Sequence, residues 1–328
     1  MQAIMRSVRA EALGLPDAYR LTEDPMPIPG AGEVLVRVRA VSLRYSGVLV
    51  SAGAYQVKPP LPFVPGSEGS GTIVAVGADV TQFAVGDAVN VSRFGGVLAD
   101  HIVARTDEVT AMPRGMSFEE AASYRTNYAT ALHALKDRAT IRAGETLLVL
   151  GAAGGVGTAA VQIGKRPGAH VIAGASSEAK RRFALKQGAD TTLDYSMSNW
   201  RDALRALTGG KGPDVNFDPV GGDLLESAFR SLGWGGRHIV IGFAGGPIPR
   251  LPANLALLKG AALVGADIRQ FALNEPDAAR ANDQLIAEWC AQGLRPPIAS
   301  LFDFADFRAA MATAARGESL GKVVVRIA

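Results

Sequence analysis

The stretch Leu147-Leu148-Val149-Leu150-Gly151-Ala152-Ala153-Gly154-Gly155-Val156-Gly157 decides the fold, and an alanine-rich run follows it directly. Its apolar start predicts a buried strand, its glycines predict a tight turn, and the run after it predicts a helix. Glycine lets a pyrophosphate approach the backbone, and the free N–H groups at the helix start bind it. The spacing is G-x-x-G-x-x-G rather than G-x-G-x-x-G, so the prediction of a dinucleotide site depends on the strand before it and the helix after it.

Strands and helices alternate from about residue 120 onward. The expected strands are 146–150, 170–173, 191–193, 214–217, 238–241 and 261–264. Segments 178–187 and 199–208 between them have helical composition. This alternation predicts a parallel sheet that is covered by helices on both faces.

Residues 1 to about 120 have a different pattern, which predicts an all-β domain. Segment 33–39 alternates apolar and charged residues, as a half-buried strand does, and segments 71–77 and 86–91 are further strands bounded by glycines. Segment 59–66 is too rich in proline for a strand and is expected as a rigid loop. Segment 321–327 is again a strand, which we expect to return to this first domain.

Length and composition narrow the class of protein. A chain of 328 residues exceeds one hydrophobic core, so two domains are expected. The net charge is only +3, and basic residues are scattered, which argues against a nucleic-acid partner. Cys290 is the single cysteine, which excludes an internal disulfide and a multi-cysteine metal site. No signal peptide or membrane-spanning run is apparent, so we expect a soluble, cytoplasmic protein without a membrane partner.

The second expected strand indicates which dinucleotide is used. Proteins that prefer NAD place an acidic residue at the end of this strand to hold the ribose 2′-hydroxyl. Here the strand ends in Gly174-Ala175-Ser176-Ser177, and Lys180 and Arg181 follow one helical turn later. A cation beside hydroxyls suits a 2′-phosphate, so NADPH is predicted. The alternative, that both cations only lie on a solvated helix face, stays open.

The sequence contains no evident acid–base or metal motif. The four histidines lack the spacing of metal ligands, and no G-x-S-x-G elbow is present. The demanding chemistry is therefore expected from the cofactor, while the protein positions donor and acceptor.

The chain resembles the zinc-independent, zeta-crystallin-like quinone oxidoreductases of the medium-chain dehydrogenase/reductase superfamily. The stretches that carry the resemblance are 55–68, 151–157, 218–222, 241–246 and 321–324. The resemblance implies a GroES-like β-barrel domain over residues 1–122 and 293–328 and a Rossmann domain over residues 123–292. It also implies a cleft between these domains and a homodimer.

The resemblance also assigns roles to individual residues. The pyrophosphate turn would be Ala153, Gly154, Gly155, Val156 and Gly157, and the 2′-phosphate would meet Ser176, Ser177 and Lys180. Tyr195 would lie on the adenosine side, Phe243 and Ala244 would flank the nicotinamide with Thr130 and Lys322 nearby, and Tyr55 would line the substrate side. No metal is expected, because zinc-dependent relatives have a cysteine where this chain has Arg44 and a histidine where it has Ser67.

Arg44 also departs from the zinc-independent relatives, which have asparagine at this position. It either points at a carbonyl-bearing or anionic substrate or turns out to solvent, and Arg125 is a second unusual arginine. We expect an NADPH-dependent reductase of quinones or related α,β-unsaturated carbonyls, with Arg44 and Tyr55 as candidates to stabilise the developing oxyanion. The alternatives are an enoyl-thioester (acryloyl-CoA-like) reductase and an NADPH-binding protein with little catalytic activity.

Overall fold

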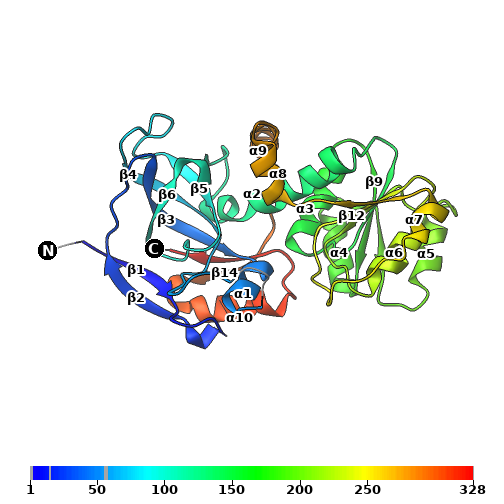
Figure 1. The fold of residues 1–328 in the computed structure, drawn as a ribbon, viewed down its shortest axis with the longest axis horizontal. Helices are drawn as coiled ribbons and strands as arrows, with labels where there is room; N and C mark the ends of the chain where they lie inside the picture. Colours follow the sequence, from blue (N-terminus) through cyan, green and yellow to red (C-terminus); the bar gives the residue numbers. More distant parts are fainter. Residues whose placement is uncertain (1–2, 15, 55–57, 328) are drawn as a thin grey trace. The chain divides into compact units, whose positions relative to one another are not determined.

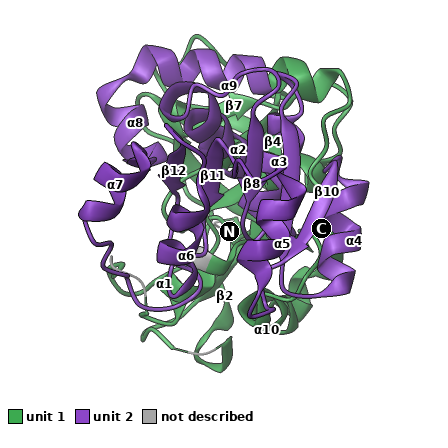
Figure 2. Ribbon diagram, turned by 90° about the vertical axis from the view of Figure 1, so that its right-hand side faces the viewer, with its two compact units in different colours: residues 1–126, 287–328 green, residues 127–286 purple. Residues whose placement is uncertain are grey.

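A computed structural model of the chain describes residues 3–14, 16–54 and 58–327 (Figure 1). The chain separates into two units, coloured separately in Figure 2. Unit 1 consists of residues 1–126 and 287–328, and unit 2 consists of residues 127–286. The C-terminal segment thus belongs to the same unit as the N-terminal part.

Unit 2 contains a six-stranded sheet in which every neighbouring pair of strands is parallel. Its strands are β8 (Thr146–Val149), β9 (His170–Ala175), β10 (Thr191–Asp194), β11 (Val215–Asp218), β12 (Arg237–Val240) and β13 (Ala262–Gly265). The order across the sheet is β10-β9-β8-β11-β12-β13, which is the 3-2-1-4-5-6 order of the doubly wound fold. The Rossmann domain predicted from the strand–helix alternation is confirmed.

The helices of unit 2 connect these strands in sequence. They are α3 (Gly155–Gly164), α4 (Glu178–Lys186), α5 (Trp200–Leu207), α6 (Leu224–Ser231) and α7 (Asn254–Lys259), and α8 (Ile268–Asn274) follows the last strand. The interior of the sheet is apolar, because Leu148, Leu150 and Ile172 are fully buried and form a cluster with Trp200. A strand buried on both faces reads as a continuous apolar run, which explains why β8 was visible in the sequence.

Two longer helices cross the boundary between the units. Helix α2 (Phe118–Leu132) continues into a π-helical segment, η3 (His133–Arg138), and α9 (Pro276–Ala291) follows α8. Within unit 2, the ring of His133 stacks on that of Phe271 in α8 with centroids 3.9 Å apart. This stack joins η3 to α8.

Unit 1 is built on a mostly antiparallel seven-stranded sheet with the path β14-β15-β3-β4-β5-β7, and β6 pairs with β3. Its strands are β3 (Glu33–Leu43), β4 (Glu68–Val76), β5 (Ala88–Ser92), β6 (His101–Arg105), β7 (Val109–Ala111), β14 (Ile298–Asp303) and β15 (Lys322–Arg326), and β1 (Ile4–Arg9) pairs separately with β2 (Arg20–Pro25). Strand β15 lies antiparallel to β3, so the expected return of the last strand to the first domain is confirmed.

The expectation that residues 1 to about 120 contain only strands and loops was wrong, because helix α1 (Tyr45–Ser51) and the short 3-10 helices η1 (Pro16–Ala18) and η2 (Thr106–Glu108) lie there. Helix α1 follows β3, and α10 (Phe307–Arg316) contacts it. The segment is rich in valine, which favours strands when it stands alone. Here Val50 is buried in the core of unit 1 together with Met311 of α10, so tertiary packing overrides the local preference.

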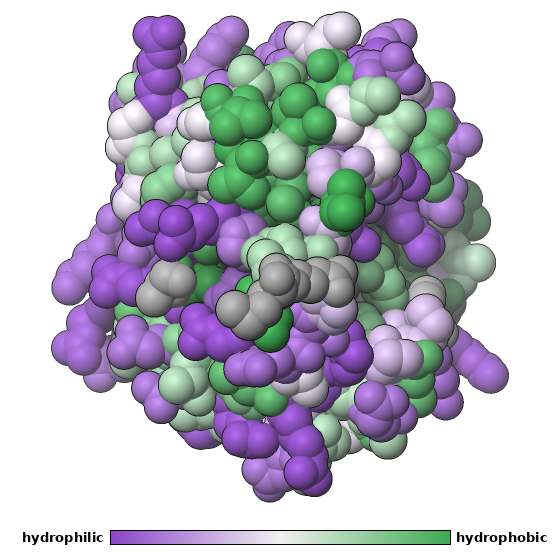
Figure 3. Space-filling model, turned by 90° about the vertical axis from the view of Figure 1, so that its left-hand side faces the viewer, coloured by the Kyte–Doolittle hydropathy of each residue, from purple (hydrophilic) through white to green (hydrophobic). Residues whose placement is uncertain are grey.

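No helix in the described ranges is long and apolar enough to cross a membrane. Much of the surface in the view of Figure 3 is hydrophilic, and hydrophobic atoms gather in one region of it. The most exposed large apolar side chains of unit 1 are Ile4, Ile28 and Val85.

Candidate active site

The glycine turn between β8 and α3 brings two backbone segments into close contact. Gly151 has a φ of +60°, a left-handed conformation that favours glycine. The N–H of Gly154 donates to the carbonyl of Gly151 over 2.9 Å, which closes the turn. A Cβ atom on Gly157 would stand 2.2 Å from the same carbonyl oxygen. The chain therefore turns from strand to helix in a space that leaves no room for a side chain at position 157.

The start of α3 presents backbone donors to an anion. Gly154 precedes the helix and is exposed, and the helix begins at Gly155. The first N–H groups of a helix have no intrahelical acceptor, and the helix dipole adds partial positive charge there. Asn127 of α2 lies against the turn, since a Cβ on Gly155 would come within 2.6 Å of its amide nitrogen. A pyrophosphate fits this geometry, because the exposed Gly154 lets an anion approach the backbone N–H groups that have no intrahelical acceptor.

Two cations, Lys180 and Arg181, follow the end of β9 and are candidates to bind a 2′-phosphate. Ser176 and Ser177 follow the strand, and the hydroxyl of Ser177 caps α4 by accepting from the N–H of Lys180 over 3.4 Å. Arg181 is engaged elsewhere, because it pairs with Asp194 at 2.6 Å and donates to the carbonyl of Ala175. Within the part of the chain that the structure describes, the ammonium of Lys180 has no ion-pair partner. Lys180 rather than Arg181 is therefore the cation available to a ligand.

Tyr195 joins this group from the next strand. It follows Asp194, the residue that lies beside Ala175 in the parallel register of β10 and β9. Burial raises the pKa of the Tyr195 phenol, and a hydrogen bond with Ser176 opposes the rise. The structure thus brings together Ser176, Ser177, Lys180 and Tyr195 at one edge of the sheet.

Two loops lie side by side at the carboxyl ends of β11 and β12. The N–H groups of Ala244 and Gly245 donate to the carbonyls of Pro219 and Val220 over 3.1 and 2.7 Å. A Cβ on Gly221 would come within 2.7 Å of the ring of Phe243. Phe243 and Ala244, predicted beside the nicotinamide, therefore stand at the same carboxyl edge of the sheet as the glycine turn.

A buried acid fixes the first of these loops. Asp218 ends β11 and is 1% exposed. One of its oxygens accepts from the N–H groups of Val220 and Gly221 over 2.8 Å each, and the other contacts Nε2 of buried His238 at 3.0 Å. Asp218 and His238 thus hold the loop that supports Phe243.

Thr130 lies in the second half of α2. Near it in the same helix, the hydroxyl of Tyr128 donates a hydrogen bond to the side chain of Gln162 in α3. Thr130 is half-buried and lies in unit 2 with the other predicted cofactor residues.

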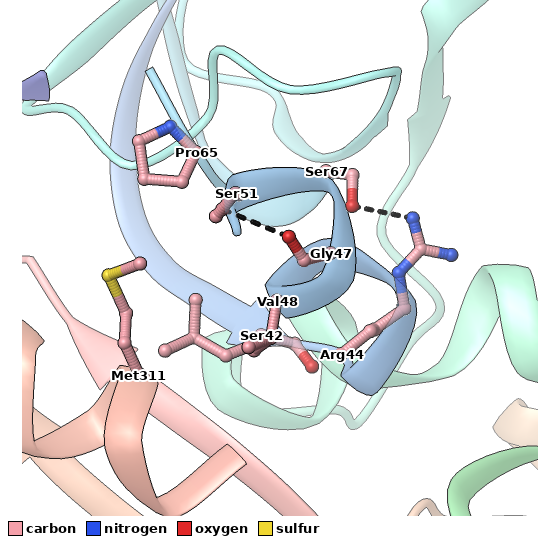
Figure 4. Close-up of a pocket in the computed structure, with 10 residues that line it drawn as sticks. Ser42, Arg44, Gly47, Val48, Ser51, Pro65, Ser67 and Met311 are labelled. Carbon is pink, nitrogen blue, oxygen red and sulfur yellow. Dashed lines mark hydrogen bonds between the residues drawn. The ribbon is translucent and has the colours of Figure 1, made fainter. Parts of the chain in front are cut away.

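Arg44, which was predicted on the acceptor side, lies in unit 1 and directly precedes α1. Its guanidinium donates to the hydroxyl of Ser67 over 2.6 Å, as Figure 4 shows. Both residues line a small pocket beside α1 together with Gly47 and Val48. Arg44 was expected either to point at a substrate or to turn out to solvent, and its half-buried contact with Ser67 contradicts the second alternative.

Lys322 lies at the start of β15 and is 5% exposed. Burial lowers the pKa of its ammonium to about 8; the nearby carboxylate of Glu68 opposes this shift and the charge of Arg44 adds to it. Glu68, at the start of β4, is fully buried. Lys322 thus belongs to a charged cluster with Glu68 and Arg44.

Tyr55 lies outside the described residues. Arg125 donates to the carbonyl of Glu108 over 3.3 Å within unit 1. No group of three or more histidine, cysteine, aspartate or glutamate side chains that could hold a metal ion occurs in residues 3–14, 16–54 and 58–327.

Comparisons with known proteins agree with this architecture. Residues 30–130 match the alcohol dehydrogenase GroES-like domain, and residues 155–284 match the zinc-binding dehydrogenase domain. The chain is 36% identical over 306 residues to quinone oxidoreductase-like protein 2 of Rattus norvegicus, a match that covers 92% of this chain and 87% of the relative. The chain belongs to the quinone oxidoreductase family of the medium-chain dehydrogenase/reductase superfamily.

Solved structures of this superfamily are similar over nearly the whole chain. The quinone oxidoreductase of Thermus thermophilus, also solved as its complex with NADPH, has a TM-score of 0.84 at 30% identity and covers 98% of this chain and all of that one. The CurK enoyl reductase has a TM-score of 0.88 at 26% identity and covers 99% of both chains. The fold class expected from the resemblance, a GroES-like domain with a Rossmann domain, is therefore confirmed.

Sequence reasoning missed several residues that shape the site of this quinone oxidoreductase family member. Asp218 begins the stretch 218–222 that carries the resemblance, but its contact with His238 was not predicted, because only the parallel register of β11 and β12 places the two side chains together. The role of Asp194 was not predicted, because the sequence alone does not show that Arg181 forms an ion pair with it. Glu68 gave a weak signal as an acid at the start of an apolar strand, where it is buried and its charge acts on Lys322.

Proposed function

We propose that this protein is an NADPH-dependent reductase that transfers a hydride to quinones or related α,β-unsaturated carbonyls without zinc. The observation that carries the proposal is a glycine turn that opens into a helix start, together with Lys180 beside two serines, which has no ion-pair partner among the residues that the structure describes. When bound, NADPH supplies the hydride. Family membership supports an oxidoreductase, and the residues of this chain support the cofactor and acceptor class.

The cofactor would be held by groups from unit 2. Backbone N–H groups of residues 153–157 would bind the pyrophosphate, with Gly154 allowing close approach. Lys180 with the hydroxyls of Ser176 and Ser177 would hold the 2′-phosphate, and Tyr195 would contact the adenosine side. Phe243, Ala244 and Thr130 would position the nicotinamide, and the Asp218–His238 pair would keep their loop in place.

The acceptor would be oriented by unit 1. Arg44 keeps a permanent positive charge and is held in place by Ser67, so it can stabilise negative charge that develops on an acceptor oxygen. We propose the same role for Tyr55. The Arg44–Ser67 hydrogen bond also joins the two positions at which zinc-dependent relatives are expected to have ligands, and a guanidinium cannot coordinate a cation.

The function is tested by following the loss of NADPH absorbance with a panel of quinones and enones. We expect turnover with members of this panel. Tight NADPH binding without turnover on any acceptor would instead support a binding protein with little activity, and would refute the reductase.

The cofactor choice has its own test in Lys180→Ala. Loss of a charge-assisted contact to phosphate is expected to lower the NADPH-over-NADH ratio of kcat/KM about ten- to hundredfold. Arg182→Ala is the matched control, because Arg182 lies on the same helix, is exposed and pairs with Glu178. Equal effects of the two variants would contradict a specific role for Lys180.

An enoyl-thioester reductase is the second candidate, favoured by the structural similarity to the CurK enoyl reductase. Turnover of a short enoyl-CoA, with competition by free coenzyme A, would support it. Turnover of quinones alone would oppose it.

We also propose a homodimer formed through strand β13. This strand is the edge of its sheet, and Leu263 in it is 48% exposed. Trp234 and Leu257 nearby in unit 2 are 84% and 82% exposed. An open edge beside exposed apolar side chains favours pairing with another strand. Light scattering should show a dimer that Leu263→Lys dissociates, whereas Val85→Lys in unit 1 should leave it intact; a monomeric parent protein would contradict the proposal.

A further inference from the structure

Three neighbouring strands of unit 1 place charged residues at one edge of the sheet. Strand β15 begins at Lys322, β3 ends just before Arg44, and β4 begins at Glu68. In the pairing register, Ser42 of β3 lies opposite both Glu68 and Val324.

Alternation along the strands puts the three charged side chains on the same face. Residues opposite each other in an antiparallel pair share a face, and so do residues two apart on one strand. Lys322 is two residues from Val324, and Arg44 is two residues from Ser42 with an extended backbone at φ −109° and ψ 149°. Lys322, Arg44 and Glu68 therefore converge on one face.

This cluster is buried and incompletely hydrogen-bonded. Lys322 is 5% exposed. Among residues 3–14, 16–54 and 58–327, one carboxylate oxygen of Glu68 and the hydroxyl of Ser42 are buried without a hydrogen-bond partner. Folded proteins rarely leave buried polar groups unsatisfied, and such groups often mark a place where a substrate or water binds.

The electrostatic setting makes Lys322 able to release a proton near neutral pH. Burial lowers the pKa of its ammonium to about 8, with Arg44 adding to the shift and Glu68 opposing it. These two are the charged groups of the described residues that act on Lys322 from the neighbouring strands. A general acid works best when its pKa lies near the working pH. Arg44 cannot take this role, because a guanidinium stays protonated.

Building on the proposed function, we propose that Lys322 donates the proton that completes reduction of the acceptor, while Glu68 and Arg44 set its charge state. Hydride addition leaves the acceptor as an enolate or a quinol anion. One N–H bond of Lys322 then breaks, and its proton forms an O–H or C–H bond on that anion. Lys322 is left as a neutral amine and regains a proton from water. This role goes beyond the position near the nicotinamide that the resemblance predicts for Lys322.

The kinetic test measures kcat against pH at saturating NADPH and acceptor. In the parent enzyme, kcat should fall as the pH rises through the pKa of Lys322, because the protonated form is consumed. Lys322→Met should lower kcat by about 10²- to 10⁴-fold, the usual contribution of general acid catalysis, and remove this limb of the profile. Lys322→Arg should stay equally slow, because it keeps the charge but not the transferable proton. Lys186→Met, at an exposed site on α4, is the control.

Charge changes around Lys322 provide a readout that a purely structural role would not move. Arg44→Gln should shift the pH limb upward, and Glu68→Gln should shift it downward. The same shifts should appear in an NMR titration of ¹³C-labelled lysine side chains in the protein without acceptor, where the signal missing from Lys322→Met identifies the residue. This titration does not depend on turnover.

The outcomes separate this proposal from the proposed function. Turnover by the parent enzyme with an unchanged rate and pH limb in Lys322→Met would overturn only the proton-donor role, as would full activity of Lys322→Arg. Absence of turnover by the parent enzyme on every acceptor would overturn the reductase itself and this role with it. A lysine signal that titrates near its ordinary value would also refute the proposal.

Discussion

Substitution of Asp137 by asparagine should destabilise unit 2 measurably. Asp137 lies in η3, where its carboxylate contacts Nδ1 of His133 at 3.1 Å and the ammonium of Lys136 at 2.8 Å. It also accepts from the amide of Asn282 in α9 over 2.7 Å. Asn282 is 2% exposed, so the carboxylate connects η3 to the buried face of α9.

The size of the effect follows from the pKa of Asp137. Burial would raise this pKa, but hydrogen bonds from His133, Lys136 and Asn282 outweigh it and lower the pKa from 3.8 to about 2. This lowering of the pKa corresponds to about 2 kcal/mol of stabilisation, at roughly 1.36 kcal/mol per pKa unit. The side chain is 21% exposed, so solvent screening removes little of this.

The pH dependence has a defined sign. The pKa of the folded state lies below that of the unfolded state, so the stabilisation is present above pH 3.8 and is lost as the pH falls towards 2. Asp137→Asn removes the charge at every pH, and should therefore lose about 2 kcal/mol at neutral pH.

Urea unfolding followed by tryptophan fluorescence measures this loss at pH 7. The control is Asp277→Asn, at the start of the same α9, whose side chain is 92% exposed and pairs with Arg280. It should change the free energy of unfolding by less than about 0.5 kcal/mol. If Asp137→Asn were as mild as this control, the proposed coupling between η3 and α9 would be refuted.

Three further predictions concern the site. Gly157→Ala should abolish measurable NADPH binding in a fluorescence titration, because its Cβ would strike the carbonyl of Gly151 at 2.2 Å; unchanged affinity would contradict the described turn. Asp218→Ala should cost at least about 3 kcal/mol in urea unfolding, since it leaves the N–H groups of Val220 and Gly221 and buried His238 without an acceptor, and a loss below about 1 kcal/mol would count against this. The lowered pKa of Lys322 means that the unfolded state binds more protons between about pH 8 and 10.5, so stability should rise by about 3 kcal/mol across this window. Lys322→Met should lack this rise, and an identical slope in both proteins would exclude a buried, charged lysine.

Much of unit 2 could be predicted from the sequence because its determinants are local. The strand, turn and helix around Gly151 lie within about twenty residues, and each buried parallel strand is a continuous apolar run. Helix α1 was missed because its stability comes from contact with α10, more than two hundred residues away. Local preference alone could not indicate it.

In the candidate site too, contiguous residues could be predicted from the sequence, whereas contacts between distant residues could not. The residues of the glycine turn and the Ser176–Lys180 segment are contiguous, so chemistry and spacing identified them together. The pairing of Arg181 with Asp194 and the cluster of Lys322 with Glu68 depend on sheet register, which a single sequence does not specify. The sequence could suggest which cations were present but not which of them was already paired.

The two glycines that flank the start of α3 are under different constraints. Gly157 is required by the backbone of its own turn, whereas a Cβ on Gly154 would meet only the carbonyl oxygen of Gly151 at 3.3 Å. A descendant of this chain that no longer bound a dinucleotide would still need glycine at 157 to fold, but would be free to accept alanine or serine at 154. In relatives that have lost cofactor binding, we therefore expect substitutions at the exposed Gly154 first. The buried Gly157 should stay glycine in these relatives, because the fold requires it.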